Sequence, residues 1–245
     1  MAHHNQLKFI ELTINEFFSN SRHLKILEIG SYNVNGIDLR KFFLSPNYTG
    51  SDIIAGPNVD LICAGQKIRH PKNYYDITMS CECFEHNPHW KSTLANMIRM
   101  TKKNGFVIFT CATKGRIEHG TARSSPESSP GNWVRKIDYY KNLTSDDFPP
   151  SLLKEFSTFM FFSNNQSFDL YFIGIKKFRT NKIAIPEGLI KKINLIKEKK
   201  GVFFYLWKVP LLIASKTLSE ESYQKFGISW YRLASKIKSF FSLYS

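Results

Sequence analysis

The feature that most constrains this chain is a series of short apolar runs that alternate with helical or loop segments. Residues 24–29 form the first run, which stops at Gly30 and leads into small and polar residues. Similar runs occupy residues 48–54, 59–63, 75–81 and 106–111, with helical or loop material between most of them. Such alternation indicates a parallel sheet covered on both faces. The sequence therefore predicts a doubly wound α/β fold.

The remaining elements complete this prediction. The clearest helix is expected at residues 89–100, with a basic end at residues 102–103 and a glycine stop at Gly105. A further helix is expected around residues 145–155, and residues 156–163 and 167–175 predict an antiparallel hairpin. We therefore expect a Rossmann-like seven-stranded sheet of five parallel strands and a C-terminal antiparallel hairpin.

The chain divides into three predicted parts. Residues 1–22 contain an amphipathic helix at residues 5–19, residues 23–180 form the α/β domain, and residues 181–245 form a basic helical extension. Within the domain, residues 112–130 are rich in Gly, Ser, Thr, Pro and charged residues. Long loops that follow a strand often carry the ligand site of an α/β sheet. We expect residues 112–145 to form an active-site loop or lid.

Charge indicates an anionic partner without choosing one. The chain has 34 Lys and Arg against 20 Asp and Glu, a formal net charge of +14, and residues 181–245 carry +8 of it through 12 basic and 4 acidic residues. Nucleic acid, a lipid surface and a phosphorylated substrate all fit. The last helix has an apolar side and a basic flank, which predicts packing on the domain, contact with an anionic membrane, or binding of a polyanion. Its apolar positions are Trp230, Leu233, Ala234, Ile237, Phe240, Phe241 and Tyr244.

The sequence gives no sign of export or of a membrane-spanning helix. The longest apolar stretch, residues 202–214, contains Lys208 and Pro210 and falls short of the roughly 20 residues that a span needs. Glu11 and Glu16 lie where a signal peptide would be apolar, and the four cysteines form no disulfide framework. We expect a cytoplasmic protein, with peripheral membrane contact as an alternative.

A glycine and an acid at the ends of the first two strands carry the strongest chemical signal. Gly30 after the first strand lets a ligand approach the backbone, and Asp52 after the second can accept hydrogen bonds from ribose hydroxyls. Such a pair suits an adenosine-containing cofactor. For Glu28, inside the first strand, we expect hydrogen bonds from the amides of the glycine loop.

Over residues 24–176 the sequence resembles the class I S-adenosylmethionine (SAM)-dependent methyltransferases. The segments LEIGSYNVNG (27–36), GSDI (50–53), YDITMSCECFEH (75–86) and MTKKNGFVIFTCA (100–112) match four family motifs in order. The sequence also resembles a bacterial subgroup, often associated with glycan or cell-surface biosynthesis, in which segments matching residues 118–121 and 138–140 are recognisable. The resemblance implies SAM as cofactor and S-adenosylhomocysteine (SAH) as product. It places the cofactor against Glu28, Gly30, Ser31, Tyr32, Asp52, Ile53, Cys63, Ala64, Ser80, Cys81 and Glu82.

Two departures from the family pattern affect this site. Tyr32 and Val34 replace the usual second and third glycines, so the loop must take a different path. The third strand ends in Cys63 and Ala64 without the acid that many relatives place against adenine. We expect adenine to be recognised by backbone groups.

Histidines are the candidate catalytic residues. A hydroxyl acceptor must lose a proton, and His119 or His86 is a suitable base; His119 could equally be an exposed loop residue. Trp133, Tyr139 and Tyr140 are expected either to stack on the substrate or to anchor the lid. Cys81, Cys83, His86 and His89 depart from zinc-site spacing, so no metal is expected. Glu85 and His86 are expected to cap or orient the next helix.

The predicted activity is methyl transfer from SAM to an oxygen, or less favourably a nitrogen, of a small molecule or glycan precursor. An RNA methyltransferase is the alternative that the charge motivates, although no RNA-binding signature accompanies it. A non-catalytic binding protein of the same fold is the alternative that the missing glycines motivate. A nicotinamide-dependent oxidoreductase lacks support because only Gly30 and Gly36 occupy the loop, without a G-x-G-x-x-G pattern.

Overall fold

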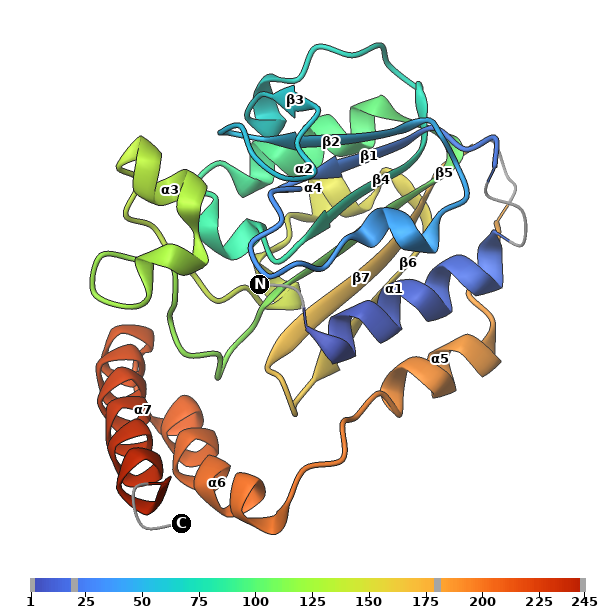
Figure 1. The fold of residues 1–245 in the computed structure, drawn as a ribbon. Helices are drawn as coiled ribbons and strands as arrows, with labels where there is room; N and C mark the ends of the chain where they lie inside the picture. Colours follow the sequence, from blue (N-terminus) through green and yellow to red (C-terminus); the bar gives the residue numbers. More distant parts are fainter. Residues whose placement is uncertain (1–2, 19–21, 179–181, 243–245) are drawn as a thin grey trace.

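The structure is a computed structural model that describes residues 3–18, 22–178 and 182–242. Seven strands form one mixed sheet in the order β3-β2-β1-β4-β5-β7-β6 (Figure 1). The strands β1 to β5 run parallel, and β7 is antiparallel to both β5 and β6. The predicted sheet is therefore confirmed. The strand bounds are β1 Ile26–Ile29, β2 Tyr48–Asp52, β3 Leu61–Ile62, β4 Tyr75–Cys81, β5 Thr101–Ala112, β6 Phe156–Asn164 and β7 Asp169–Lys176.

Helices bury both faces of the sheet (Figure 1). Helices α1 (His4–Phe17) and α5 (Glu187–Asn194) cover one face, where Ile26 and Ile108 point. Helices α2 (Trp90–Met100) and α4 (Pro150–Leu153) lie on the other, where Leu27 and Phe109 point. Successive side chains of a strand thus point alternately into two separate cores. Both faces of the central strands are therefore buried, which explains why these strands appear in the sequence as continuous apolar runs.

Three predicted boundaries differ from the structure. The third strand shrinks to two residues, Leu61 and Ile62. Residues 102–105 belong to β5 rather than to a helix end, because the β4–β5 pairing shifts register there and Asn104 takes a positive φ of 59°. The helix expected at residues 145–155 is only the turn η5 (Ser145–Asp147) and α4, since Pro149 and Pro150 cannot donate the hydrogen bonds that would join them.

The C-terminal part forms two long helices, α6 (Val202–Thr217) and α7 (Glu220–Ser242). Helix α6 lies within the predicted helical extension, although its own bounds were not predicted, and it continues through Pro210. Lys208 anchors α6 to the turn between β6 and β7, since its Nζ donates to the carbonyl oxygens of Asn165 and Gln166. Within the described residues, no helix combines the length and apolar character needed to cross a membrane.

Helix α7 packs on the domain through its first half. Tyr223 is buried, and its Oη donates to the carbonyl oxygen of Gly115. Gln224 accepts a hydrogen bond from Glu118 N at 2.7 Å and donates to Arg116 O at 3.0 Å. Packing is thus observed for this half. The side chains of Ile237, Phe240, Phe241 and Tyr244 on the predicted apolar side lie outside the described ones.

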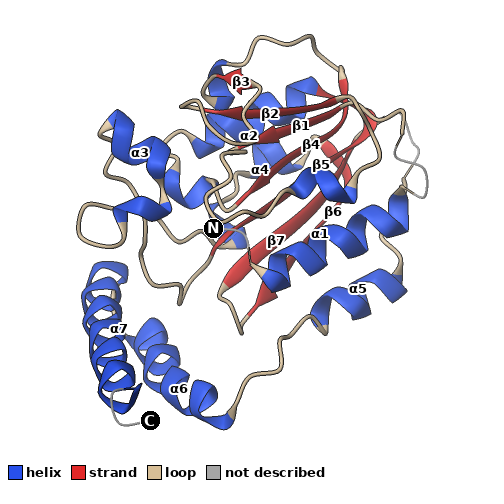
Figure 2. Cartoon of the chain, in the orientation of Figure 1, coloured by secondary structure: helices blue, strands red, loops and turns tan. Residues whose placement is uncertain are grey.

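The long segment after β5 crosses the carboxyl ends of the strands. Figure 2 shows it as loop interrupted by short helical turns, which are η4 (Pro126–Ser128) and α3 (Pro130–Arg135). It also runs past the first turns of α7. This segment therefore contacts both the strand ends of the sheet and the C-terminal helix α7.

Candidate active site

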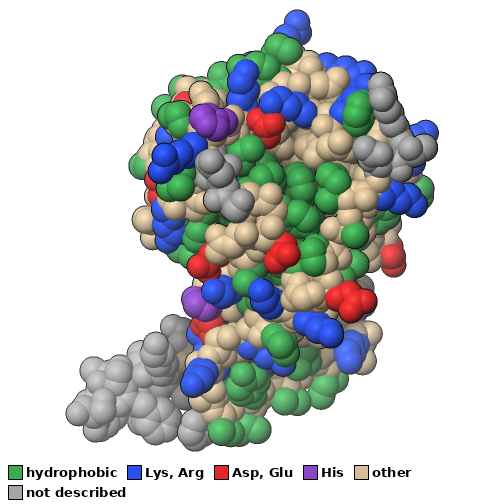
Figure 3. All heavy atoms as spheres, turned by 90° about the vertical axis from the view of Figure 1, so that its right-hand side faces the viewer, with side chains coloured by type: hydrophobic (Ala, Val, Ile, Leu, Met, Phe, Trp, Pro, Cys, Tyr) green, Lys and Arg blue, Asp and Glu red, His purple; other side chains and the backbone are tan. Residues whose placement is uncertain are grey.

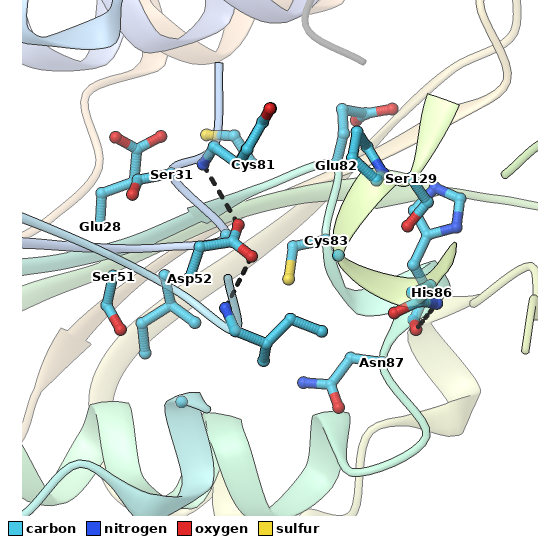
Figure 4. A pocket seen from close by; sticks show the side chains of 18 of the residues that line it. Glu28, Ser31, Ser51, Asp52, Cys81, Glu82, Cys83, His86, Asn87 and Ser129 are labelled. Atoms are coloured by element: carbon cyan, nitrogen blue, oxygen red, sulfur yellow. Dashed lines mark hydrogen bonds between the residues drawn. The ribbon is translucent and has the colours of Figure 1, made fainter. Parts of the chain in front are cut away.

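A cavity opens at the carboxyl ends of β1, β2 and β4, where the strand order reverses between β1 and β4 (Figure 4). This is the place where open α/β sheets bind ligands. We call it the strand-end cavity. Of the expected cofactor residues, it is lined by Glu28, Gly30, Ser31, Tyr32, Asp52, Ile53, Cys63, Ala64, Cys81 and Glu82.

Ser80 is the one expected cofactor residue that does not line the cavity. It is fully buried, and its Oγ donates to the carbonyl oxygen of Ile29 at 3.0 Å. Alternation along β4 turns Ser80 away while Cys81 reaches the cavity. Ser80 therefore ties β4 to β1 instead of meeting a ligand.

Gly30 shapes the floor of the strand-end cavity. Its φ of +81° favours glycine, and a Cβ there would lie 2.6 Å from Cys83 Cβ. The amides of Gly30 and Ser31 both donate to the carbonyl oxygen of Ser51. The loop that follows is held by β2 rather than by further glycines, which accounts for its tolerance of Tyr32 and Val34.

Asp52 holds this loop in place and faces the cavity. Its two carboxylate oxygens accept hydrogen bonds from Tyr32 N at 3.2 Å and Ile53 N at 2.7 Å (Figure 4). Burial raises the pKa of Asp52, while these backbone hydrogen bonds act in the opposite direction. Each carboxylate oxygen has further lone pairs, so the carboxylate can also accept hydrogen bonds from a diol.

Glu28 is a buried acid whose partner differs from the prediction. The Oη of Tyr48 donates to Glu28 Oε2 at 2.7 Å, in place of the expected loop amides. Burial raises the pKa of Glu28 to about 7, although this hydrogen bond lowers it. Glu28 therefore gains a proton near neutral pH, which allows it to donate as well as accept.

Helix α3 covers the strand-end cavity as a lid. Asn132 Nδ2 donates to His86 O at 2.8 Å, and Arg135 Nη2 donates to Ile53 O at 2.9 Å. A Cβ on Gly131 would lie 2.8 Å from Cγ1 of Ile53, so only glycine allows this close approach. Both hydrogen bonds end on backbone carbonyls at the rim, which fixes α3 over the cavity.

A second cavity of about 740 Å³ lies between the domain and the C-terminal helices. Its walls include Arg116, His119, Phe168, Lys208 and Arg232. Ser128 of the lid lines both cavities. We call this second space the interhelix cavity.

The two candidate catalytic histidines meet where the cavities adjoin. His86 lines the strand-end cavity and His119 lines the interhelix cavity, with ring centroids 4.8 Å apart. Burial lowers the pKa of His119 to about 3 and holds that of His86 well below its ordinary value. Both rings are therefore neutral, and their low basicity disfavours a simple general-base role in this arrangement.

The three aromatic residues expected at the substrate differ in their surroundings. Tyr140 packs edge-on against both histidine rings, and its Oη donates to Asn142 Oδ1 at 3.0 Å. Tyr139 is half-buried and Trp133 is exposed, and neither lines the two cavities. Of these three residues, only Tyr140 contacts the candidate catalytic histidines, and it packs against both of their rings.

The expected capping role of Glu85 and His86 is wrong. The first turn of α2 is held by Asn87, whose Oδ1 accepts from His89 N and whose Nδ2 donates to Thr93 Oγ1. Glu85 instead points inside the protein and is completely buried. Burial raises its pKa to about 8.

Several residues of the site were missed from the sequence. The unforeseen residues lining the strand-end cavity include Asn58, Gly65, Gln66, Asn87, Gly131, Asn132 and Ile137. The Asn87–Pro88 step directly after the fourth-strand motif was a usable signal, since it marks a turn at a strand's carboxyl end. Asn132 and Ile137 carried no such signal, because the path of the lid decides their position.

The strand order and the cavity define a Rossmann-like α/β domain built to bind a nucleoside cofactor. Residues 19–109 match a family model described as a methyltransferase domain. This part of the chain is therefore similar to methyltransferase domains, as the four sequence motifs implied. No curated protein matches the chain.

Three of the solved structures to which the chain is similar are titled as methyltransferases. One is 1,6-didemethyltoxoflavin-N1-methyltransferase of Burkholderia thailandensis with bound SAH, at 12% identity over 70% of this chain and 78% of that chain, with a TM-score of 0.47. The CurJ carbon methyltransferase has 13% identity over 70% and 54%, with a TM-score of 0.49. A phosphoethanolamine N-methyltransferase of Haemonchus contortus has 14% identity over 68% and 52%, with a TM-score of 0.45.

Proposed function

We propose that this enzyme transfers the methyl group of SAM to a hydroxyl oxygen of a small molecule or glycan precursor. The observation that carries the proposal is the junction of the two cavities at Ser128, His86 and His119. The strand-end cavity accommodates the cofactor, and the interhelix cavity admits the acceptor. The junction is where donor and acceptor would meet.

The residues of the strand-end cavity fit SAM. Asp52 would bind the ribose hydroxyls, and Glu28 and the backbone at Gly30 would line the methionine part. The Ser31 hydroxyl is buried without a hydrogen-bond partner in the described structure, so it is available to a ligand. Cys63 and Ala64 offer backbone groups to adenine in place of an acid. SAM would supply an electrophilic methyl group, and the protein would align the acceptor and exclude water.

The interhelix cavity fits an acceptor that carries negative charge. Five basic side chains line it, namely Arg116, Arg123, Lys200, Lys208 and Arg232, against the acids Glu118 and Glu198. Several of these cations have acidic partners, as in the pair of Arg123 with Glu118. The excess of positive charge still favours a phosphorylated acceptor over a neutral one. Nucleotide-linked and lipid-linked sugars have this chemistry.

A methyl-transfer screen tests the proposal. Purified full-length protein would be incubated with labelled SAM and either nucleotide sugars, lipid-linked sugar phosphates, or their neutral parent sugars. We expect label in a phosphorylated sugar as a methyl ether, which mass spectrometry and NMR distinguish from an N-methyl product. Label transferred only to RNA, in a manner that falls steeply with salt, would contradict the proposal and favour the RNA alternative.

We also propose that α6 contacts an anionic membrane surface. Val202, Leu206, Val209 and Ile213 are all exposed and fall on one side of the helix. Figure 3 shows hydrophobic side chains beside Lys and Arg side chains on the lobe that contains α6. An exposed apolar stripe beside basic residues is typical of an interfacial helix. Such contact would bring the enzyme to a lipid-linked acceptor.

Vesicle flotation tests the membrane contact. We expect the full-length protein to float with vesicles containing phosphatidylserine and the double variant Leu206→Ser/Ile213→Ser to stay in solution. Leu195→Ser is the matched control, because Leu195 is also exposed but follows α5. Equal flotation of wild type and double variant would remove α6 from the contact.

A further inference from the structure

Three side chains at the junction of the cavities leave buried polar atoms without hydrogen bonds. Both carboxylate oxygens of Glu85, both ring nitrogens of His86 and Nε2 of His119 have no hydrogen-bond partner within the described part of the chain. Glu85 is completely buried, and His86 is 7% exposed. Leaving such groups unpaired in a protein interior is costly. The cluster is therefore incomplete as a self-contained polar network.

The three side chains have the chemistry of a metal site. One ligand atom from each of Glu85, His86 and His119 lies within 4.8 Å of the other two. Ligands about 2.1 Å from a tetrahedral zinc ion lie about 3.4 Å apart, so small side-chain rotations would bring these atoms to coordination distance. Two imidazoles and one carboxylate suit zinc and other divalent transition metals.

Neighbouring contacts already orient these groups. Nδ1 of His119 lies 3.2 Å from Ile117 O, which favours a proton on Nδ1 and leaves Nε2 with its lone pair. The backbone carbonyl of His86 accepts from Asn132 Nδ2, and that of Glu85 accepts from Lys141 N at 2.9 Å. Tyr140 packs edge-on against both rings. Contacts of this kind hold ligands in place around metal ions.

A second group of acids and histidine nearby is different. His3, Glu82 and Asp169 also place ligand atoms within 4.8 Å. Asp169, however, already binds His3 at 3.0 Å and Arg116 at 3.3 Å, and it accepts from Tyr171 Oη. The guanidinium of Arg116 therefore already supplies the positive charge that a metal ion would bring to Asp169. Only the Glu85 cluster has unused ligand atoms on all three members.

We infer that Glu85, His86 and His119 bind one divalent transition-metal ion of zinc-like preference at the junction of the two cavities. Three protein ligands leave coordination positions open toward an acceptor. The inference deepens the proposed methyl transfer and rests on it. A cation there makes an acceptor hydroxyl more acidic, so that its proton leaves to water. The oxygen then bonds to the methyl carbon while the carbon–sulfur bond breaks, and sulfur keeps that electron pair in SAH.

Metal titration of the full-length protein tests this site without an activity assay. Protein stripped with a chelator would be titrated with Zn²⁺ by calorimetry, and bound zinc would be counted by mass spectrometry. We expect one zinc ion per chain in the wild-type protein. The zinc affinity of Glu85→Gln and of His119→Gln should be reduced by about 100-fold or more. His23→Gln is the control, because His23 is an exposed histidine before β1, and it should bind like wild type.

Two outcomes would overturn the metal site. One is the absence of stoichiometric zinc binding by the folded wild-type protein. The other is equal zinc affinity in wild type, Glu85→Gln and His119→Gln. If circular dichroism shows that the variants do not fold, Co²⁺ is added to the wild-type protein instead. Absence of the visible absorption bands of histidine-coordinated cobalt would then also overturn the site. SAH binding by the same wild-type samples distinguishes the two proposals. A wild-type protein that binds SAH but no zinc contradicts only the metal site, whereas a folded wild-type protein that does not bind SAH contradicts the proposed methyl transfer.

Discussion

The imidazole rings of His86 and His119 meet edge to face, with centroids 4.8 Å apart and an interplanar angle of 85°. His86 follows β4 and faces the cofactor side, whereas His119 lies in the long segment after β5 and faces the interhelix cavity. Their contact joins the site predicted from strand motifs to a cavity that the C-terminal helices complete. The C-terminal helices therefore contribute to the shape of the interhelix cavity.

Replacing His119 with glutamine should separate catalysis from cofactor binding. His119 lines only the interhelix cavity, so we expect SAH affinity to remain within about twofold while turnover of the methyl acceptor falls at least tenfold. Turnover assays and SAH titration on the same preparation check this. His89→Gln is an informative comparison, since His89 is exposed and lines the cofactor side. Unchanged turnover in His119→Gln would exclude His119 from the reaction.

Gly30→Ala should damage both stability and cofactor binding. The added methyl would meet Cys83 Cβ at 2.6 Å, and the φ of +81° is unfavourable for alanine by about 1–2 kcal/mol before that overlap is counted. Thermal unfolding and SAH titration measure the two effects. Gly188→Ala is the matched control, because nothing lies within 4 Å of its added Cβ and the residue is helical. An unperturbed Gly30→Ala protein would contradict the described loop.

The raised pKa of Glu28 predicts a pH-dependent stability. Glu28 keeps its proton in the folded protein up to about pH 7, whereas in the unfolded chain it ionises near pH 4.5. The folded state binds the extra proton in this window, so the free energy of unfolding falls as pH rises from 4.5 to 7. The shift corresponds to about 3 kcal/mol at pH 8.

Glu28→Gln should remove this part of the pH dependence. We expect the variant to match wild type near pH 4.5 and to be more stable at pH 8, as measured by urea unfolding across the range. Identical pH profiles for both proteins would show that Glu28 ionises normally in the fold.

The contact of α7 with the loop that carries His119 predicts a remote effect on catalysis. Gln224→Ala removes the hydrogen bonds at 2.7 Å to Glu118 N and at 3.0 Å to Arg116 O. We expect a several-fold loss of acceptor turnover with unchanged SAH affinity, because the strand-end cavity does not include these residues. Lys225→Gln is the control, since the Lys225 side chain is 71% exposed. A loss of SAH affinity equal to the loss of turnover would instead indicate general destabilisation.

The lining of the strand-end cavity could be predicted from the sequence because its residues follow directly from strand ends. Gly30 and Asp52 each stop a strand, and parallel strands bring their carboxyl ends to one edge. Ser80 shows the limit of that reasoning, since one step along a strand turns a side chain to the opposite face. A strand's residue range predicts its position better than the direction of a given side chain.

The interhelix cavity depends on contacts between distant segments, and its position was largely beyond prediction. The sequence does not show that His119 meets His86, since the fold of residues 112–145 decides it. The bounds of α6 within the predicted helical extension were not predicted, because Lys208 and Pro210 interrupt its apolar pattern, yet Lys208 donates to backbone carbonyls on the β6–β7 turn. Tertiary contacts here override the local signal.

The most direct test of the account is calorimetric titration of the full-length protein with SAH, using wild type, Asp52→Asn and Asp146→Asn. Asp146 is an exposed acid of η5 and serves as the matched control. We expect saturable one-to-one binding to wild type and to Asp146→Asn, with affinity about 10- to 100-fold lower in Asp52→Asn because charge-assisted hydrogen bonds to the ribose are lost. No SAH binding by the folded wild-type protein, or equal binding by Asp52→Asn, would contradict the proposed cofactor site.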